Sequence, residues 1–186
     1  MSKRSRIILE GTIVAALSMA LSFIPLNIGT GFSVSLGMIP LTLYALRRGT
    51  VPGVYAGLIW GLLHFLMGQV YFLTVSQVII EYIFAFAAAG FSGVFSTKLQ
   101  TALKTNPSSA WKYVVSGTFF GTLIRYIFHF IAGFIFWGKY AIWGLSPVTY
   151  SLVANGISGF LTGLATVIVL LLILNKNKSL FMPKDN

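Results

Sequence analysis

Residues 148–174 read VTYSLVANGISGFLTGLATVIVLLLIL, a stretch without a single charged side chain. A helix needs about 20 mostly apolar residues to cross the hydrocarbon core of a bilayer. A helix also pairs its backbone polar groups internally, which lipid cannot do for it. This stretch therefore predicts a transmembrane helix and a protein that is embedded in a membrane.

Five more apolar runs precede it, so we expect an all-α, polytopic membrane protein with six transmembrane helices. Residues 1–186 are expected to form one domain, because no linker, repeat or low-complexity segment divides them. The second run is short and contains Pro40, which predicts a tilted, kinked or partly spanning helix. The five runs are Ile8–Leu26, Val34–Leu46, Val51–Met67, Phe72–Phe95 and Tyr113–Phe136.

Composition supports lipid as the solvent. Hydrophobic residues make up 56% of the chain and charged residues 9%, whereas soluble domains contain about a quarter charged residues. The net charge of +10 comes from basic residues in the gaps between apolar runs, and Lys98, Lys104 and Lys112 are expected in the longest loop, after the fourth run. This distribution follows the positive-inside rule rather than forming a nucleic-acid surface. Both termini are therefore expected on the cytoplasmic side of the cell membrane, with only Lys139 in an outer loop.

The amino terminus begins MSKRSR and then becomes apolar, as a secretory signal peptide does. Its apolar run is long for a signal peptide and carries Glu10, so we expect a retained first helix. Cysteine is missing from the chain, which excludes disulfides, thiolate metal ligands and cysteine nucleophiles. With two histidines, no metal site and no cofactor are expected, and His64 is interpreted as a packed or interfacial residue.

Four polar side chains are expected at one depth in the outer half of the membrane. Counting 1.5 Å per residue from the outer helix ends places Glu81, Arg125, His129 and Asn155 about 10 to 16 Å below the surface. Ionisable groups at such depth usually face a bundle interior or a wet cavity. The convergence predicts a polar cavity that opens outward.

Helical spacing adds aromatic and small residues to this cavity. Arg125, His129, Gly133 and Trp137 recur every four residues and share one face of the fifth helix. Gly133 is expected to leave space for a flat ring beside the helix. Trp137 also fits an interfacial aromatic belt, as do Tyr140 and Trp143 elsewhere in the chain.

The role of Glu81 has three interpretations. It can bind a ligand, act as a proton relay, or pair with Arg125, since a buried guanidinium needs an acceptor.

On the sixth helix, Ser151 and Asn155 lie four residues apart, and Tyr150 precedes them. These three side chains are expected on the same cavity.

Two features outside the cavity have open interpretations. The segment NIGTGFS (Asn27–Ser33) is either a glycine-rich lid or an ordinary turn. Thr12, Ala16 and Ala20 form a stripe of small residues that either packs internally or admits a partner helix.

Neither a phosphate-binding loop nor a catalytic nucleophile motif occurs, so the protein is not expected to be an enzyme, and any uphill transport needs a partner or an ion gradient.

Several segments resemble the ThiT family, the thiamine-binding S-components of energy-coupling factor (ECF) transporters. The resemblance implies tight binding of thiamine from outside, docking on a module of one transmembrane subunit and two ATPases, and release inward. The segments are LRRG (Leu46–Gly49), GLIWG (Gly57–Gly61), SQVIIEY (Ser76–Tyr82), HFIAGFIFW (His129–Trp137) and YSLVANGISG (Tyr150–Gly159).

The resemblance also implies which residues bind thiamine. The family's lid tryptophan is missing here, and the nearest aromatic residue is Phe32. The family's docking motif on the first helix corresponds to Thr12–Ala16, with Ala20 extending it. An S-component for another vitamin or flat heterocycle is the alternative, and an intramembrane enzyme would need paired carboxylates that the sequence lacks. The implied ligand residues are Glu81, Tyr82, His129, Gly133, Trp137, Tyr150, Ser151 and Asn155.

Overall fold

The computed structural model describes residues 2–28 and 32–183, and the chain is almost entirely helical there. A 31-residue rod, Val75–Thr105, consists of α4 (Val75–Val78), the π-helix η1 (Ile79–Phe84), α5 (Ala85–Ala88), the 3-10 helix η2 (Ala89–Phe95) and α6 (Ser96–Thr105). Two short strands, β1 (Asn27–Ile28) and β2 (Phe32–Ser33), pair antiparallel. The other α-helices are α1 (Lys3–Ser22), α2 (Met38–Arg48), α3 (Thr50–Leu66), α7 (Ala110–Phe136) and α8 (Pro147–Lys176), and the short 3-10 turns are η3 (Pro107–Ser109), η4 (Gly138–Tyr140) and η5 (Lys178–Phe181).

Each of the six predicted apolar runs coincides with one of these helices, and the all-α membrane fold is confirmed. Four helical segments are long and apolar enough to cross a bilayer, within the described part of the chain. The second predicted helix, α2, has only 11 residues. The prediction that Lys98 and Lys104 lie in a long loop is wrong, because α6 continues the fourth helix and buries Leu99 and Ala102.

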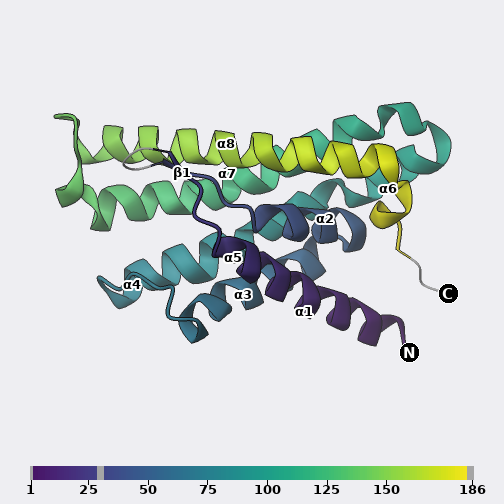
Figure 1. Ribbon diagram of the computed structural model, residues 1–186, viewed down its shortest axis with the longest axis horizontal. Coiled ribbons are helices and arrows are strands. Elements are labelled where there is room, and N and C mark those ends of the chain that lie inside the picture. The colour runs from purple at the N-terminus through teal and green to yellow at the C-terminus, as the bar shows by residue number, and fades with distance from the viewer. Residues whose placement is uncertain (1, 29–31, 184–186) are drawn as a thin grey trace.

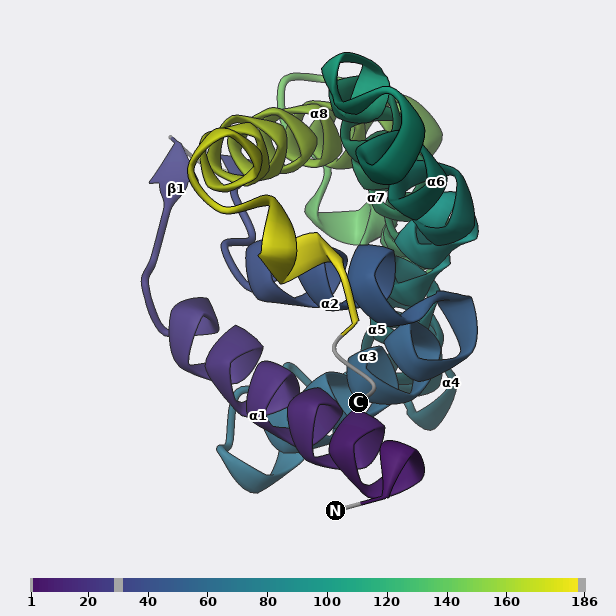
Figure 2. The same ribbon diagram turned by 90° about the vertical axis from the view of Figure 1, so that its right-hand side faces the viewer.

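The helices form two layers around α2. Long α7 and α8 lie antiparallel, side by side, while α1, α3 and α4–α5 lie on the opposite side of α2 (Figures 1 and 2). Met38, Leu41, Ala45 and Leu46 of α2 are inaccessible to solvent. Because neighbouring helices enclose α2, its shortness leaves room for a cavity beyond its amino-terminal end.

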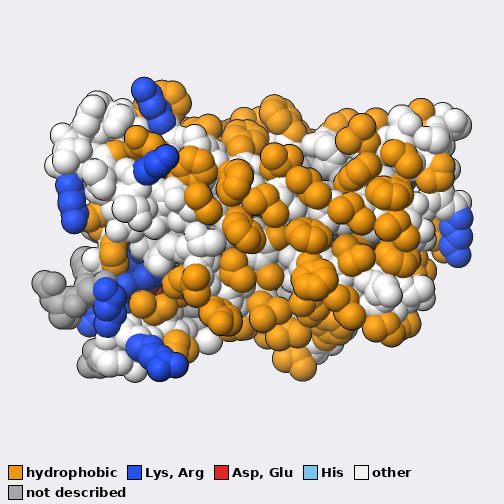
Figure 3. Space-filling view, turned by 180° about the vertical axis from the view of Figure 1, so that it is seen from behind, with side chains coloured by type: hydrophobic (Ala, Val, Ile, Leu, Met, Phe, Trp, Pro, Cys, Tyr) orange, Lys and Arg blue, Asp and Glu red, His pale blue; other side chains and the backbone are white. Residues whose placement is uncertain are grey.

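The outer surface of the bundle is suited to lipid. A broad hydrophobic band covers the middle of the face in Figure 3, and basic side chains gather mainly at one end. Leu123 is 60% exposed and Leu152 is 58% exposed. Exposing such side chains to water costs free energy, whereas contact with lipid acyl chains does not. The protein is therefore a multi-pass membrane protein. The start of α1 and the end of α8 lie at the same end of the molecule (Figure 1), as the predicted common location of the two termini requires.

A charge cluster joins three chain segments at this basic end. Glu10 of α1 accepts hydrogen bonds from Arg48 Nε at 2.7 Å and Arg48 Nη2 at 2.8 Å. Arg47 Nε also donates to Glu10, at 3.3 Å, and Arg47 Nη1 donates to the carbonyl oxygen of Ser179 at 3.1 Å. The predicted first helix thus holds its carboxylate against α2 rather than exposing it to lipid.

Close packing of α3 against the rod depends on two glycines. A Cβ atom added to Gly61 would lie 1.9 Å from the Tyr82 carbonyl oxygen, and one added to Gly57 would lie 2.3 Å from the Phe86 carbonyl oxygen. Both obstacles are backbone atoms, which cannot rotate away. This contact fixes the position of the helix that carries Glu81 and Tyr82.

We predict that Gly61→Ala lowers the free energy of unfolding by about 1–3 kcal/mol, since the added methyl group overpacks a backbone contact. SDS titration of the protein in mixed micelles, followed by tryptophan fluorescence, measures the change. Gly156→Ala is the matched control, because a Cβ there meets no atom within 4 Å. Equal stabilities of the two variants would contradict the packing argument.

Candidate functional site

Two adjoining cavities lie between the helices, toward the end of the molecule opposite the start of α1 and the end of α8. One, of about 400 Å³, is lined by Glu81, Tyr82 and Trp137, and we call it the acidic chamber. The other, of about 310 Å³, is lined by Arg125 and Asn155, and we call it the basic chamber. Their shared lining residues are Ser22, His64, Phe86 and His129.

In the acidic chamber, Glu81 is held by two donors. Trp137 Nε1, from the end of α7, donates to Glu81 Oε1 at 2.8 Å. Gln77 Nε2 donates to the other carboxylate oxygen, Oε2. A carboxylate offers about four acceptor positions, so Glu81 retains capacity for a ligand donor. Beside it, the Tyr82 hydroxyl accepts a hydrogen bond from the Tyr71 backbone N–H at 3.0 Å.

In the basic chamber, Arg125 is 5% exposed and is stabilised mainly by aromatic faces. Its guanidinium carbon lies 4.7 Å from the ring centroid of Trp60 and 4.5 Å from that of Phe86. Its Nη1 donates to Ser35 Oγ at 2.9 Å. Cation–π contacts of this kind contribute about 2 kcal/mol each when desolvated.

The Glu81–Arg125 ion pair, one of the predicted alternatives, does not form in the described structure. Glu81 is bonded to Gln77 and Trp137, and Arg125 is bonded to Ser35. The sequence interpretation assumed that only a carboxylate can satisfy a buried guanidinium. Here Trp60 and Phe86 take that place, which leaves the Glu81 carboxylate for other partners.

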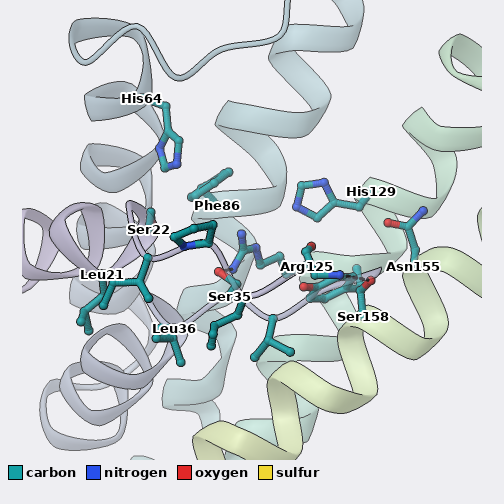
Figure 4. Close-up of a pocket in the computed structure, with 16 residues that line it drawn as sticks. Leu21, Ser22, Ser35, Leu36, His64, Phe86, Arg125, His129, Asn155 and Ser158 are labelled. Atoms are coloured by element: carbon teal, nitrogen blue, oxygen red, sulfur yellow. Dashed lines mark hydrogen bonds between the residues drawn. The ribbon is translucent and has the colours of Figure 1, made fainter. Parts of the chain in front are cut away.

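His129 lies where the two chambers meet. Its ring centroid is 5.5 Å from that of Tyr126 and 6.3 Å from that of Phe86. Figure 4 shows His129 and Asn155 on one side of the basic chamber, with Phe86 and His64 across from them. The four polar residues expected at one depth therefore border a common hollow, although Glu81 and Arg125 occupy different ends of it.

Asn155, Ser151 and Gly133 form a polar contact between α7 and α8. Asn155 Nδ2 donates to the Ser151 carbonyl oxygen at 3.0 Å, and the Ser151 hydroxyl donates to the Phe130 carbonyl oxygen at 2.8 Å. A Cβ on Gly133 would lie 2.2 Å from Ser151 Oγ. The space that Gly133 was expected to leave for a ligand ring therefore holds Ser151, and this glycine sets the approach of the two helices.

Phe32 and Tyr150 meet through a third aromatic residue. The Phe32 ring stacks on Trp143 at a centroid distance of 5.8 Å, and Trp143 contacts Tyr150 edge-on at 5.7 Å. We call Phe32, Trp143 and Tyr150 the outer aromatic cluster. Trp143, which also fits an interfacial aromatic belt, is 54% exposed and joins β2 to α8. Residues 29–31, the centre of the predicted lid, lie outside the described residues.

Sequence reasoning missed Gln77, Ser35, Trp60 and Phe86. Gln77 was detectable, because it is a polar residue four positions before Glu81 in an apolar run. Ser35, Trp60 and Phe86 carry no such signal, since their roles depend on how helices far apart in sequence meet. His64, interpreted as a packed or interfacial residue, borders both chambers and is 8% exposed.

This geometry defines a polytopic membrane protein with an internal, two-ended site for a small organic molecule. Residues 8–182 match the family described as thiamine transporter protein. The chain is 37% identical to the thiamine transporter ThiT of Lacticaseibacillus paracasei, over 98% of this chain and 94% of that protein. It is 34% identical to the thiamine transporter ThiT of Bacillus subtilis, over 83% and 82% of the two chains.

A solved structure of ThiT from Listeria monocytogenes superposes with a TM-score of 0.94 and 46% identity, over 98% of this chain and all of that one. The chain therefore belongs to the thiamine transporter family, whose members are transporters and not enzymes.

Proposed function

We propose that the protein captures thiamine from outside the cell and delivers it inward as the S-component of an ECF transporter. The observation that carries this proposal is the Glu81 carboxylate, which is held by two donors, is not bonded to Arg125 and borders a chamber with aromatic walls. Thiamine combines a cationic thiazolium, an aminopyrimidine and a hydroxyethyl group. Such a ligand needs an acceptor for its amino group and π faces for its positive charge.

Each proposed contact with thiamine is made by a side chain that lines one of the two chambers. Glu81 accepts from the pyrimidine amino group, and Trp137, Tyr82 and His129 present rings to the planar parts of thiamine. Asn155 borders the basic chamber and supplies a polar group to the far end of the ligand. Desolvated donors and acceptors each need a partner, so a polar lining of this kind favours a polar heterocycle over a lipid.

The remaining proposed ligand residues act from the edge of the site. Ser151 and Gly133 hold α7 and α8 together behind Asn155, so they shape the site without bordering either chamber. Phe32 and Tyr150, with Trp143, form the outer aromatic cluster. We propose that this cluster covers the ligand in place of the family's lid tryptophan.

Delivery inward needs a partner, because the sequence contains no recognisable nucleotide-binding motif. Thr12, Ala16 and Ala20 are exposed on α1, whereas Ala15 and Met19 are buried against the bundle. This exposure favours the alternative in which the stripe admits a partner helix over internal packing. We propose that the stripe receives a helix of the ECF transmembrane subunit, which operates with two ATPase subunits.

We predict that Glu81→Gln and Trp137→Ala each weaken thiamine binding by about tenfold or more, or about 1.4 kcal/mol. Glutamine loses the charge, and alanine loses both the ring and the donor to Glu81. Isothermal titration calorimetry of thiamine into purified protein measures the dissociation constants. Trp111→Ala is the control, since Trp111 is half exposed near the opposite end of α7. Unchanged affinity in both site variants would overturn the assignment of the thiamine site to this hollow.

We predict that Ala16→Trp abolishes ATP-driven thiamine uptake in proteoliposomes that contain the ECF module, while thiamine affinity stays within about threefold of the original. The indole blocks a helix that packs closely against the stripe. Leu152→Trp, at another exposed position, on α8, is the control and keeps uptake. Normal uptake by Ala16→Trp would exclude the stripe as the docking surface.

A further inference from the structure

Gln77 is fully buried beside the site, and its side-chain amide is bonded at both ends. Its Oε1 accepts a hydrogen bond from the Leu73 backbone N–H at 3.1 Å. Its Nε2 donates to Glu81 Oε2. An amide group has one acceptor end and one donor end, so the Leu73 N–H fixes which end faces Glu81. Gln77 can therefore present only a donor to the carboxylate.

The backbone around Gln77 also holds its amide within reach of Glu81. Thr74 caps the start of α4, with its Oγ1 accepting from the Gln77 N–H at 3.1 Å. Gln77 then lies one helical turn before Glu81, within reach of its carboxylate. The helix widens into the π-helix η1 at Ile79, just before Glu81. Single π turns of this kind recur at functional sites, where they redirect side chains.

Two donors on two different oxygens determine the plane of the carboxylate. The terminal torsion of a glutamate is otherwise broad, because rotation about an sp³–sp² bond has shallow minima. Trp137 Nε1 holds Oε1 and Gln77 Nε2 holds Oε2. Trp137 itself borders the chamber, whereas Gln77 does not.

We propose that Gln77 is a positioning residue, which sets the affinity for the N–H donor of the ligand by fixing the Glu81 carboxylate. The inference rests on the proposed function, since it concerns the same site and the amino group of thiamine. Gln77 makes no contact with the ligand in this account. Its effect must therefore disappear when either Glu81 or the amino group of the ligand is altered.

Gln77→Met tests this inference, because methionine has a similar length and no hydrogen-bonding amide. Binding is measured by calorimetry for thiamine and for the analogue in which hydrogen replaces the pyrimidine amino group. We expect Gln77→Met to weaken thiamine by about tenfold and the analogue by less than about threefold. Equal weakening of the two ligands means a merely structural role and would overturn the inference.

The same comparison in a Glu81→Gln background gives a second readout, at thiamine concentrations up to the millimolar range. Gln77→Met should then change the affinity by less than about threefold, because the carboxylate it positions is already gone. An additive tenfold loss in this background contradicts the inference. Failure of the unaltered protein to bind thiamine would instead overturn the proposed function.

Thr74→Ala is the matched local control. It removes the cap of α4 and leaves the Gln77–Glu81 hydrogen bond in place. We expect a lower melting temperature with thiamine affinity within about threefold of the original. A tenfold loss of thiamine affinity in this variant would show that local stability, and not the donor from Gln77, controls the site.

Discussion

Burying a carboxylate and a guanidinium inside a lipid-embedded bundle is costly unless each receives its own partners. In this protein the two charges have separate partners. Arg125 lies against the rings of Trp60 and Phe86 and donates to Ser35, while Glu81 is bonded to Gln77 and Trp137. Because the two do not neutralise each other, the hollow keeps an acidic end that a cationic heterocycle can occupy.

The helix arrangement follows from the need to hold these partners at fixed distances. Short α2 is enclosed on its sides, so the space beyond its amino-terminal end remains available for the chambers. Gly57 and Gly61 bring α3 against the rod that carries Glu81, and Gly133 brings α7 against α8 near Asn155. These contacts place the proposed ligand residues of the rod, α7 and α8 around one hollow.

Much of this arrangement was predictable from the sequence. Apolar runs gave the helices, and a rise of 1.5 Å per residue placed Glu81, His129 and Asn155 at similar depth. The choice of partner for Arg125 was not predictable, since aromatic faces contributed by α3 and α5 depend on tertiary packing. The continuation of the fourth helix through Lys98 and Lys104 was missed because its polar residues resemble a loop, while Leu99 and Ala102 pack against the core. The π turn at Glu81 has no recognised sequence signal.

A crystal structure of the protein with thiamine bound tests most directly whether Glu81 binds the ligand while Arg125 keeps its separate partners. We expect the ligand to span both chambers, with its amino nitrogen about 3 Å from a Glu81 carboxylate oxygen and Arg125 still in contact with the rings of Trp60 and Phe86. Thiamine density outside the hollow, or Glu81 turned away to pair with Arg125 in the complex, would contradict the account.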